Sequence, residues 1–590
     1  MPKVYHIPML DPYRMVAINL IASFLLLTGI IFYKFIYPKK SINFLFLLIL
    51  ICTLPSISIL REGVYESGDF NIHIYRTMEF YRSLTEGIIM PSWAGELNAS
   101  YGYPLHIFNY SLPYYLTSFF HLIGFSFIGS LKLFLVLNIF LSGVFMYLFS
   151  QKIFKNDLAA FVSSIFYVFA PYHLIDIHFK VVVGEILFFT ILPLSFLSIY
   201  YLKENKNLFS IIITSLSVAA LIISHLVLAL FAGIFMLSFV LLTSLKNNLK
   251  LVFSCAIIAL CISLLISLPT WLGSFLMSEY SYIQNINLGT SYFPILSDIL
   301  YSPWRMGLLF QGPKGEISHL IGYSQLFIVV LLIFLLSKNK VIKKLRFEVL
   351  FWLSSFFIIT FLILPYSRPI WESFPVIKIV GSHRLLLFIS FVSSVLAGYA
   401  TIALNKKWVI FLLIFTAISS TVLNWGQRNV IPKINDNILQ NNIGKSTSEG
   451  EAHFYANTKW VDINNPWFST PPKNHAEAIS GNGKLESIIR KSTYHKYSIM
   501  AETPLKIQEN TLYFPGWKGF LNGREISLSP SAKGIITTSI PKGNFTLEIR
   551  YEDIFIYKLL KTISIISLIS IIIILTIHLL IKLRSFLNSK

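Results

Sequence analysis

The chain has 590 residues, of which 55% are hydrophobic and only 13% are charged. Since a soluble chain is about a quarter charged, this composition excludes an ordinary soluble enzyme and a disordered protein. Long apolar runs recur from residue 16 to residue 582, and they lack the alternation of barrel strands. The sequence therefore predicts a polytopic helical membrane protein.

Each apolar run is long enough to cross, or nearly cross, a bilayer as a helix. The tight pair of runs around Ser224 and His225 is either one broken helix or a hairpin. The three cysteines, Cys52, Cys255 and Cys261, lie inside apolar runs, so their spacing predicts neither a disulfide framework nor a zinc site. We predict 13 spans, at about 16–37, 42–60, 128–150, 158–175, 186–202, 208–224, 226–244, 250–271, 321–337, 348–364, 384–403, 408–425 and 560–582.

The net charge of +20 would suggest nucleic-acid binding in a soluble protein. Here the basic residues gather in short loops that fall on one side of the membrane if the spans alternate, and the positive-inside rule assigns that side to the cytoplasm. The N-terminus then lies outside despite Lys3 and Arg14. These loop residues are Lys39, Lys40, Lys152, Lys155, Lys203, Lys206, Lys246, Lys250, Lys338, Lys340, Lys343, Lys344, Arg346, Lys406, Lys407, Lys582, Arg584 and Lys590.

The large loops at 61–127, 272–320, 365–383 and 426–559 then face the periplasm or the extracellular space. We expect a helical membrane domain over 1–425, which includes the external loop 61–127. An external domain follows over 426–559, and 560–590 forms a membrane anchor with a cytoplasmic tail. Residues 440–485 have a loop composition. From about 494, short β-like stretches separated by turns predict a small antiparallel domain.

The first external loop carries charged residues at helical spacing. Asp69, His73 and Arg76 are spaced i, i+4 and i+7, so they share one helical face at the membrane boundary. A carboxylate, an imidazole and a guanidinium together suit an anionic substrate and a general base. The same spacing also fits an interfacial helix with a solvated polar face.

This loop resembles the opening of bacterial GT-C-type membrane glycosyltransferases. The resemblance is strongest to the 6-pyruvoyl-tetrahydropterin-synthase-related membrane proteins, with the YfhO-like proteins as cousins. The pattern is an acid, then His and Arg on a helix, then a Pro-x-Trp element, then Gly-Tyr-Pro-Leu and a Tyr pair. The matching residues are Asp69, His73, Arg76, Gly87, Pro91, Trp93, Gly102, Tyr103, Pro104, Leu105, Phe108, Leu112, Tyr114 and Tyr115.

Four later segments extend the resemblance. Lys180 and Glu185 match a basic-to-acidic element that precedes Leu-Pro-Leu, with Lys where Arg is more usual. Ser224-His225 matches an S-H motif, and Arg384 opens a late helix from the external side. Residues 513–526 resemble the Pro-Gly-Trp-Lys element of the external domain in YfhO-like proteins.

The resemblance implies an all-α GT-C-like membrane fold of about 13 helices with a small external β-rich domain. It also implies transfer of a sugar from a polyprenyl-phosphate donor to a glycan, lipid or protein acceptor outside the bacterial cytoplasmic membrane. Asp69 and Glu185 would be the catalytic residues, with Asp69 as the base. The substrate-binding residues would be His73, Arg76, Tyr103, Lys180, His225, His383 and Arg384.

Relatives differ in their need for a divalent metal, so no cofactor is assigned and a divalent cation stays open. Asp69, His73, Glu185 and His178 are too widely spread in sequence to predict a metal site. Glu185 fits either a site carboxylate or a structural ion pair with Lys180, Arg76 or Arg384, because an acid entering the membrane requires a partner. The segment around Asp176 fits a re-entrant or a surface turn.

Two other classes compete with glycosyl transfer. A transporter or flippase of lipid-linked glycans would usually show broken helix pairs in matching halves, and no such symmetry is visible. A non-catalytic envelope assembly protein would use the external β domain to bind a glycan or a partner.

Overall fold

The computed structural model describes residues 11–244, 249–283, 292–404, 406–426, 430–431, 433–442, 456–461 and 470–588. The chain divides into two compact units, and each is described by itself. Unit 1 comprises residues 1–70, 131–260 and 287–434. Unit 2 comprises residues 71–130, 261–286 and 435–590.

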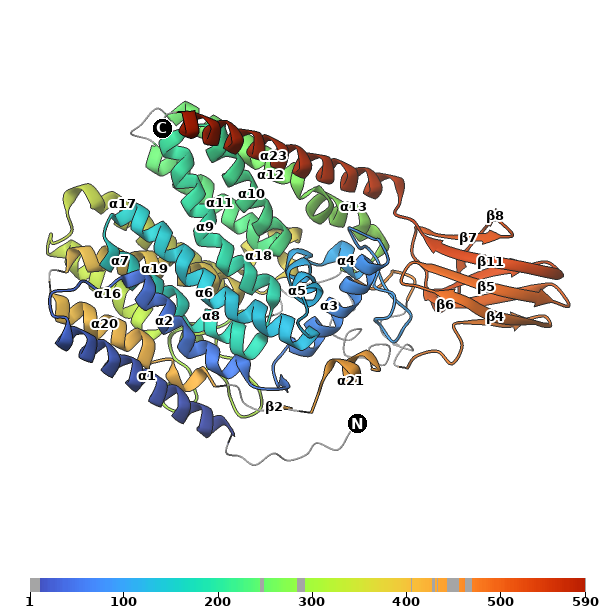
Figure 1. Cartoon of the computed structure of the whole chain (residues 1–590), viewed down its shortest axis with the longest axis horizontal. Helices are drawn as coiled ribbons and strands as arrows, with labels where there is room; N and C mark the ends of the chain where they lie inside the picture. Colours follow the sequence, from blue (N-terminus) through green and yellow to red (C-terminus); the bar gives the residue numbers. More distant parts are fainter. Residues whose placement is uncertain are drawn as a thin grey trace. The chain divides into compact units, whose positions relative to one another are not determined.

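Unit 1 is a bundle of apolar helices. Its centre is α19, which packs against α7, α16 and α17, while α9 packs against α10 and α11 (Figure 1). Nearly all of α19 is buried, and the Phe391 ring lies 4.8 Å from that of Phe196 and 5.5 Å from that of Phe149. The main helices are α1 (Asp11–Ile36), α2 (Phe44–Ser56), α6 (Phe127–Phe154), α7 (Asp157–Val168), α8 (Pro171–Ile175), α9 (Val183–Asn205), α10 (Leu208–Ser224), α11 (Leu226–Ser244), α12 (Leu249–Ile266), α15 (Leu296–Leu300), α16 (Tyr323–Ser337), α17 (Arg346–Ile363), α18 (Arg368–Ser373), α19 (Leu386–Ala403) and α20 (Lys407–Ser419).

Among the described residues, 7 helices are long and apolar enough to cross a membrane, or up to 9 if each of two bent helix pairs is one span. The predicted count of 13 is therefore not confirmed. Four shorter apolar helices occupy other predicted spans. The 7 helices are Arg14–Ile36, Phe127–Phe154, Val183–Asn205, Lys343–Ile363, Ser382–Ala403, Lys407–Asn424 and Phe555–Lys582, and the shorter ones are Phe44–Leu60, Leu208–Ser224, Leu226–Leu241 and Tyr323–Ser337.

Two of the predicted spans correspond to bent helix pairs, because the helix breaks near a proline. The predicted span 158–175 bends by 45° between α7 and the segment Pro171–Lys180. The predicted span 250–271 ends at Ile266 and bends by 59° into Pro269–Tyr280. Proline has no amide hydrogen and its ring clashes with the preceding turn, so it ends or bends a helix. At the Ser224-His225 pair, α10 ends and α11 begins on either side of an extended His225.

Unit 2 joins three helices of the first external loop to the β domain and the last helix. The loop helices are α3 (Phe70–Thr85), α4 (Leu105–Phe108) and α5 (Leu112–Leu122). Its other helices are α13 (Ser274–Met277), α21 (Asp436–Gln440) and α23 (Phe555–Asn588). Gly273, just before α13, leaves room for the Tyr557 ring of α23, because a Cβ there would lie 2.4 Å from that ring.

The β domain consists of two antiparallel sheets (Figure 1). One sheet has the order β3-β6-β10-β9 and the other β4-β5-β11-β7-β8. Every β-like stretch expected between 494 and 551 lies in or overlaps a strand, but the β-rich part begins earlier, at Ala476. The strands are β3 (Ala476–Ser480), β4 (Gly483–Arg490), β5 (Tyr494–Ala501), β6 (Leu505–Leu512), β7 (Trp517–Leu521), β8 (Arg524–Ile526), β9 (Ser529–Pro530), β10 (Ile535–Ile540) and β11 (Gly543–Tyr551).

The predicted sidedness can be tested with two exposed positions. Lys338 follows α16 and Glu502 follows β5. In a Cys261→Ser background, a membrane-impermeant maleimide is expected to label Glu502→Cys in intact cells and Lys338→Cys only after permeabilisation. This is because the positive-inside rule places Lys338 in the cytoplasm. Labelling of both positions from the same side would contradict the predicted orientation.

Candidate functional site

Five side chains of unit 1 form a partly buried charged cluster, comprising Tyr172, Asp176, Lys180, Glu185 and Arg384. Tyr172 lies in α8, and Asp176 and Lys180 begin and end a π-helical turn that follows it. Glu185 lies in the first turn of α9, and Arg384 in the turn before α19. Three sequence segments therefore place their polar groups at one point.

The cluster is held by direct ion pairs and hydrogen bonds. Lys180 Nζ lies 2.9 Å from Asp176 Oδ1 and 3.4 Å from Glu185 Oε2. Arg384 forms an ion pair with the other oxygen of Glu185, Oε1. The Tyr172 hydroxyl donates to Glu185 Oε2 at 2.6 Å and accepts from Lys180 Nζ at 3.2 Å. Of the three candidate partners for Glu185, Lys180 and Arg384 form ion pairs with it.

The acids and the cations of the cluster differ in exposure. The side chains of Glu185 and Asp176 are 0% and 3% exposed, whereas those of Lys180 and Arg384 are 15% and 24% exposed. Arg384 Nε has no hydrogen-bond partner among the described residues. The carboxylates therefore lie beneath two positive groups that reach the surface, an arrangement suited to binding an anion.

Asp69 is fixed to this cluster through its backbone. Its amide donates to the Lys180 carbonyl at 2.8 Å, and the Gly68 amide donates to the Phe179 carbonyl at 2.8 Å. A Cβ at Gly68 would lie 3.0 Å from the Lys180 carbonyl oxygen, so glycine permits this close approach. The predicted base therefore immediately precedes α3 and lies directly beside the turn that carries Lys180.

The turn that carries Lys180 ends in an unfavourable backbone conformation. Val181 has φ of 58° and ψ of 50°, in the left-handed region, and its amide donates to the Asp176 carbonyl at 2.6 Å. A β-branched residue rarely adopts this conformation, which costs about 1–3 kcal/mol unless the surroundings impose it. The segment Pro171–Lys180 is buried rather than a surface turn, so the surface-turn interpretation is wrong.

Histidines from three segments approach the same cluster. His225, at the break between α10 and α11, lies close enough to Asp176 for an electrostatic interaction. The His383 ring, next to Arg384, lies 4.7 Å from the His319 ring, which in turn lies 5.4 Å from the Tyr292 ring. Sequence analysis identified His225 and His383, but it missed His319 and Tyr292, whose only signal is their place in the external segment 272–320.

The predicted residues of the first loop, His73, Arg76 and Tyr103, belong to unit 2 and are buried. His73 Nδ1 hydrogen-bonds the Tyr114 hydroxyl at 2.9 Å. Burial and the nearby Arg76 charge hold the pKa of His73 well below its usual value. The alternative of an interfacial helix with a solvated polar face is therefore wrong for α3. Substrate binding by these three residues stays a prediction.

Two sequence motifs more than 400 residues apart meet in the core of unit 2. Trp93, from the first loop, packs edge-to-face on Trp517 of the Pro-Gly-Trp-Lys element, with ring centroids 5.3 Å apart. Gly95 lies so close to the β4–β5 turn that a Cβ there would be 2.8 Å from Ser492 Cα. These contacts bind the first external loop to the β domain, and they give Trp93 a role in packing.

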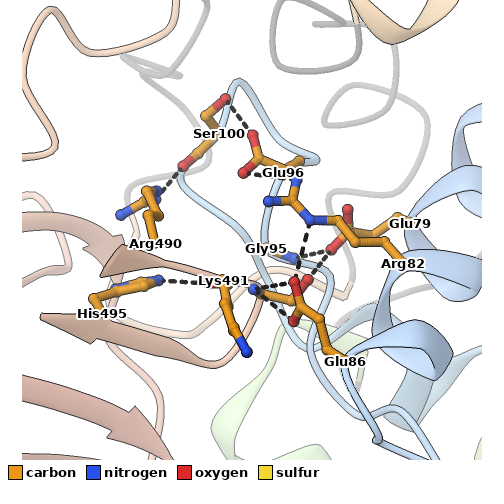
Figure 2. A network of polar contacts seen from close by, with 10 residues as sticks. Glu79, Arg82, Glu86, Gly95, Glu96, Ser100, Arg490, Lys491 and His495 are labelled. Atoms are coloured by element: carbon orange, nitrogen blue, oxygen red, sulfur yellow. Dashed lines mark hydrogen bonds and ion pairs between the residues drawn. The ribbon is translucent and has the colours of Figure 1, made fainter. Parts of the chain in front are cut away.

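A polar network reinforces this junction (Figure 2). Glu79 Oε1 of α3 accepts from the Gly95 amide at 2.7 Å and from the Ser492 hydroxyl at 3.1 Å. On the β-domain side, Arg490 Nη2 donates to the Ser100 carbonyl at 3.1 Å. Glu79 is fully buried, and its Oε2 has no hydrogen-bond partner among the described residues. Burial raises the pKa of Glu79 from 4.5 to about 7.

Glu79→Gln is expected to raise the Tm more at pH 8 than at pH 5. Because the folded pKa of Glu79 is raised, stability is highest below pH 4.5 and falls until about pH 7. The loss is about 3 kcal/mol. Glutamine keeps the accepting oxygen and carries no charge, so it removes this loss. Thermal unfolding in detergent at both pH values measures the effect, and an equal Tm change at both would contradict it.

Among the described residues, no group of three or more His, Cys, Asp or Glu side chains could hold a metal ion. In the charged cluster, Asp176 and Glu185 are engaged by Lys180 and Arg384. These residues do not fit a divalent cation site, and no chemical step is derived through a metal.

The model of one protein family matches residues 108–431, which is more than half of the chain. This family is described as a 6-pyruvoyl-tetrahydropterin synthase related domain and a membrane protein. The match includes Lys180, Glu185, His225, His383 and Arg384. It does not extend to Asp69, His73, Arg76 or Tyr103.

An uncharacterised protein of Lactococcus lactis subsp. cremoris is 23% identical over 225 residues, which cover 37% of each chain. Two solved structures are similar at a low level. The arabinofuranosyltransferase AftD from Mycobacteria has a TM-score of 0.41 and 13% identity, over 65% of this chain and 27% of that one. The Archaeoglobus fulgidus oligosaccharyltransferase, in the apo form, has a TM-score of 0.40 and 12% identity, over 65% and 56%.

The chain thus spans between about a quarter and just over half of the length of these proteins.

Proposed function

The chain belongs to the 6-pyruvoyl-tetrahydropterin synthase related family of membrane proteins, and we propose that it is a glycosyltransferase. It moves a sugar from a polyprenyl-phosphate-linked donor to an envelope glycan, lipid or protein acceptor. The transfer takes place on the external face of the bacterial cytoplasmic membrane, where the large loops lie. Donor, acceptor, location and residue roles are parts of this proposal.

The observation that carries the proposal is the difference in exposure within the charged cluster. Lys180 and Arg384 reach the surface, while Asp176 and Glu185 beneath them are almost completely buried. Guanidinium donates paired hydrogen bonds and keeps its charge, which suits a phosphate group. In this proposal the donor phosphate binds to Lys180 and Arg384, and the two acids hold these cations in place.

The reaction requires one base and one stabilised leaving group. Asp69 removes the proton from the acceptor hydroxyl, and the oxygen attacks the anomeric carbon of the donor. The bond between that carbon and the phosphate oxygen breaks, and the lipid phosphate leaves with the electron pair. Lys180 and Arg384 stabilise the charge that develops on this oxygen. A single base suffices because phosphate is a good leaving group.

Glu185 is assigned here as the carboxylate that orients Arg384 and Lys180. His225 and His383 are assigned as substrate contacts beside the cluster. His73, Arg76 and Tyr103 of unit 2 are further proposed contacts. The expectation that Arg76 and Arg384 converge on one external cavity stays a prediction, because the two arginines belong to different units.

The test uses purified protein in liposomes with a panel of undecaprenyl-phosphate-linked sugars carrying a radiolabel on the sugar, and an envelope extract as the acceptor. The expected result is transfer of label to a product that is no longer attached to undecaprenyl phosphate. Movement of the intact donor across the membrane without loss of its sugar would instead indicate a flippase. Absence of both would favour a non-catalytic assembly protein. Either outcome would overturn the proposal.

Arg384→Lys is expected to lower donor use in this assay although it keeps the positive charge. Arg384→Ala is expected to lower donor use further. Lysine keeps one positive charge but lacks the planar fork that donates two hydrogen bonds to phosphate. Initial rates over a range of donor concentrations measure the effect. Donor use by Arg384→Lys equal to that of the wild type would contradict a direct phosphate contact.

A further inference from the structure

A row of aromatic rings leads away from the charged cluster of unit 1. His383 immediately precedes Arg384 in the sequence, and its ring centroid lies 4.7 Å from that of His319. The Tyr292 ring lies 5.4 Å from His319 and 6.4 Å from His383. Lys180 interacts electrostatically with both imidazoles. We call Tyr292, His319 and His383 the aromatic wall.

Exposure increases along this row. Glu185 is completely buried, Arg384 and His319 are half-buried, and Tyr292 is 47% exposed. The cationic groups are therefore followed by an aromatic surface, and this surface is more exposed farther from Glu185. A ligand that places an anion on Arg384 has an aromatic surface available for the group next to that anion.

Local structure positions the two histidines of the aromatic wall. A Cβ at Gly381 would lie 2.4 Å from the His383 ring, so glycine makes room for the imidazole. Next to His319, the Ser318 amide donates to the Phe310 carbonyl at 2.8 Å. The Phe310 amide in turn donates to Asn424 Oδ1 at 2.9 Å. Contacts within unit 1 thus position the His383 ring and the backbone next to His319.

We propose that the aromatic wall is the subsite for the sugar ring of a phosphate-linked donor, with Tyr292 and His319 as its specificity-determining residues. This inference rests on the proposed function, because it takes the phosphate on Lys180 and Arg384 as the anchor. A pyranose or furanose presents C–H groups on its faces, which pack on an aromatic ring, and hydroxyls at its edges. Tyr292 supplies the ring surface.

His319 supplies hydrogen bonds to the hydroxyls. Burial and the charge of Lys180 lower the pKa of His319 to about 4, so the imidazole is neutral at physiological pH. A neutral imidazole has one donor and one acceptor nitrogen, which matches a hydroxyl group. It also adds no charge beside the phosphate. The subsite therefore selects a neutral, hydroxylated ring.

The experiment compares two kinds of lipid, undecaprenyl phosphate without a sugar and undecaprenyl phosphate that carries one. Affinities of undecaprenyl phosphate and of undecaprenyl phosphoglucose, phosphogalactose and phosphoarabinose are measured on the full-length protein by native mass spectrometry. Tyr292→Ala and His319→Ala are each expected to weaken the best-bound sugar-linked lipid by about 10-fold, as expected for loss of a ring contact or a hydrogen bond. Binding of undecaprenyl phosphate should change less than twofold. Tyr292→Phe, which keeps the ring, should bind like the wild type.

Tyr301→Ala is the matched control, because Tyr301 is also an exposed tyrosine of unit 1 and its ring neighbour is Tyr323 rather than the aromatic wall. It should bind both kinds of lipid as the wild type does. An equal loss for both kinds of lipid, no loss for either, or the same selective loss in Tyr301→Ala would overturn the sugar subsite. If the wild type binds neither kind of lipid, the proposed function itself fails, which is a different outcome.

Discussion

Asp69→Asn is expected to reduce sugar transfer by about 10²–10⁴-fold, which is the usual contribution of a general base. The change keeps the shape of the side chain and removes its basicity. The backbone bond from Asp69 to the Lys180 carbonyl does not depend on the side chain, so folding and membrane insertion should be unchanged. Initial rates with saturating donor measure sugar transfer, and the Tm in detergent measures folding stability.

Glu62→Gln provides the control, because Glu62 is an exposed carboxylate seven residues earlier in the same loop. Its rate should equal that of the wild type. Turnover by Asp69→Asn within twofold of the wild type would rule out Asp69 as the base. A parallel loss of Tm would mean that the carboxylate acts on folding instead.

The second large effect concerns the stability of the charged cluster. Arg384→Ala is expected to destabilise unit 1 by about 3–5 kcal/mol, because it leaves a buried carboxylate with too little positive charge. Glu185→Gln should be less damaging, since Arg384 and Lys180 reach solvent and glutamine can still accept from the Tyr172 hydroxyl. Denaturation of the purified variants in detergent shows which of the two substitutions destabilises the protein more.

The double variant Arg384→Ala with Glu185→Gln separates this account from simple loss of packing. Removing both charges also removes the unpaired one, so the double variant should be more stable than Arg384→Ala alone. If the two substitutions destabilise the protein additively, the ion pair between Arg384 and Glu185 does not account for the destabilisation.

The strands and most of the helices could be predicted because their signals are local. Each expected stretch from 494 onward has β-branched or aromatic residues between turn residues, and each lies in or overlaps an observed strand. β3 was missed because Ala476–Ser480 is short and lies in a polar segment. The bends at Pro171 and Pro269 were missed because hydropathy reports the length of an apolar run and not its continuity as a helix.

Part of the candidate site could also be predicted. An acid that enters a membrane helix requires a cation, which gave Lys180, Arg76 and Arg384 as candidate partners of Glu185, and the structure pairs it with Lys180 and Arg384. The segment around Asp176 fitted either a re-entrant or a surface turn. Only the fold shows that Asp176 forms an ion pair with Lys180. His319 and Tyr292 were not identified because their closeness to His383 depends on packing between distant segments. Such packing cannot be predicted from a local sequence pattern.

The central claim is that Lys180 and Arg384 hold the phosphate of a lipid-linked donor. The most direct measurement is a cryo-EM map of the wild-type protein in a lipid nanodisc with bound undecaprenyl phosphate. The account predicts phosphate density within hydrogen-bonding distance of Lys180 Nζ and of the Arg384 guanidinium, with the Glu185–Arg384 pair intact. Phosphate density at another place, with the charged cluster unchanged and its two cations facing empty solvent, would contradict it.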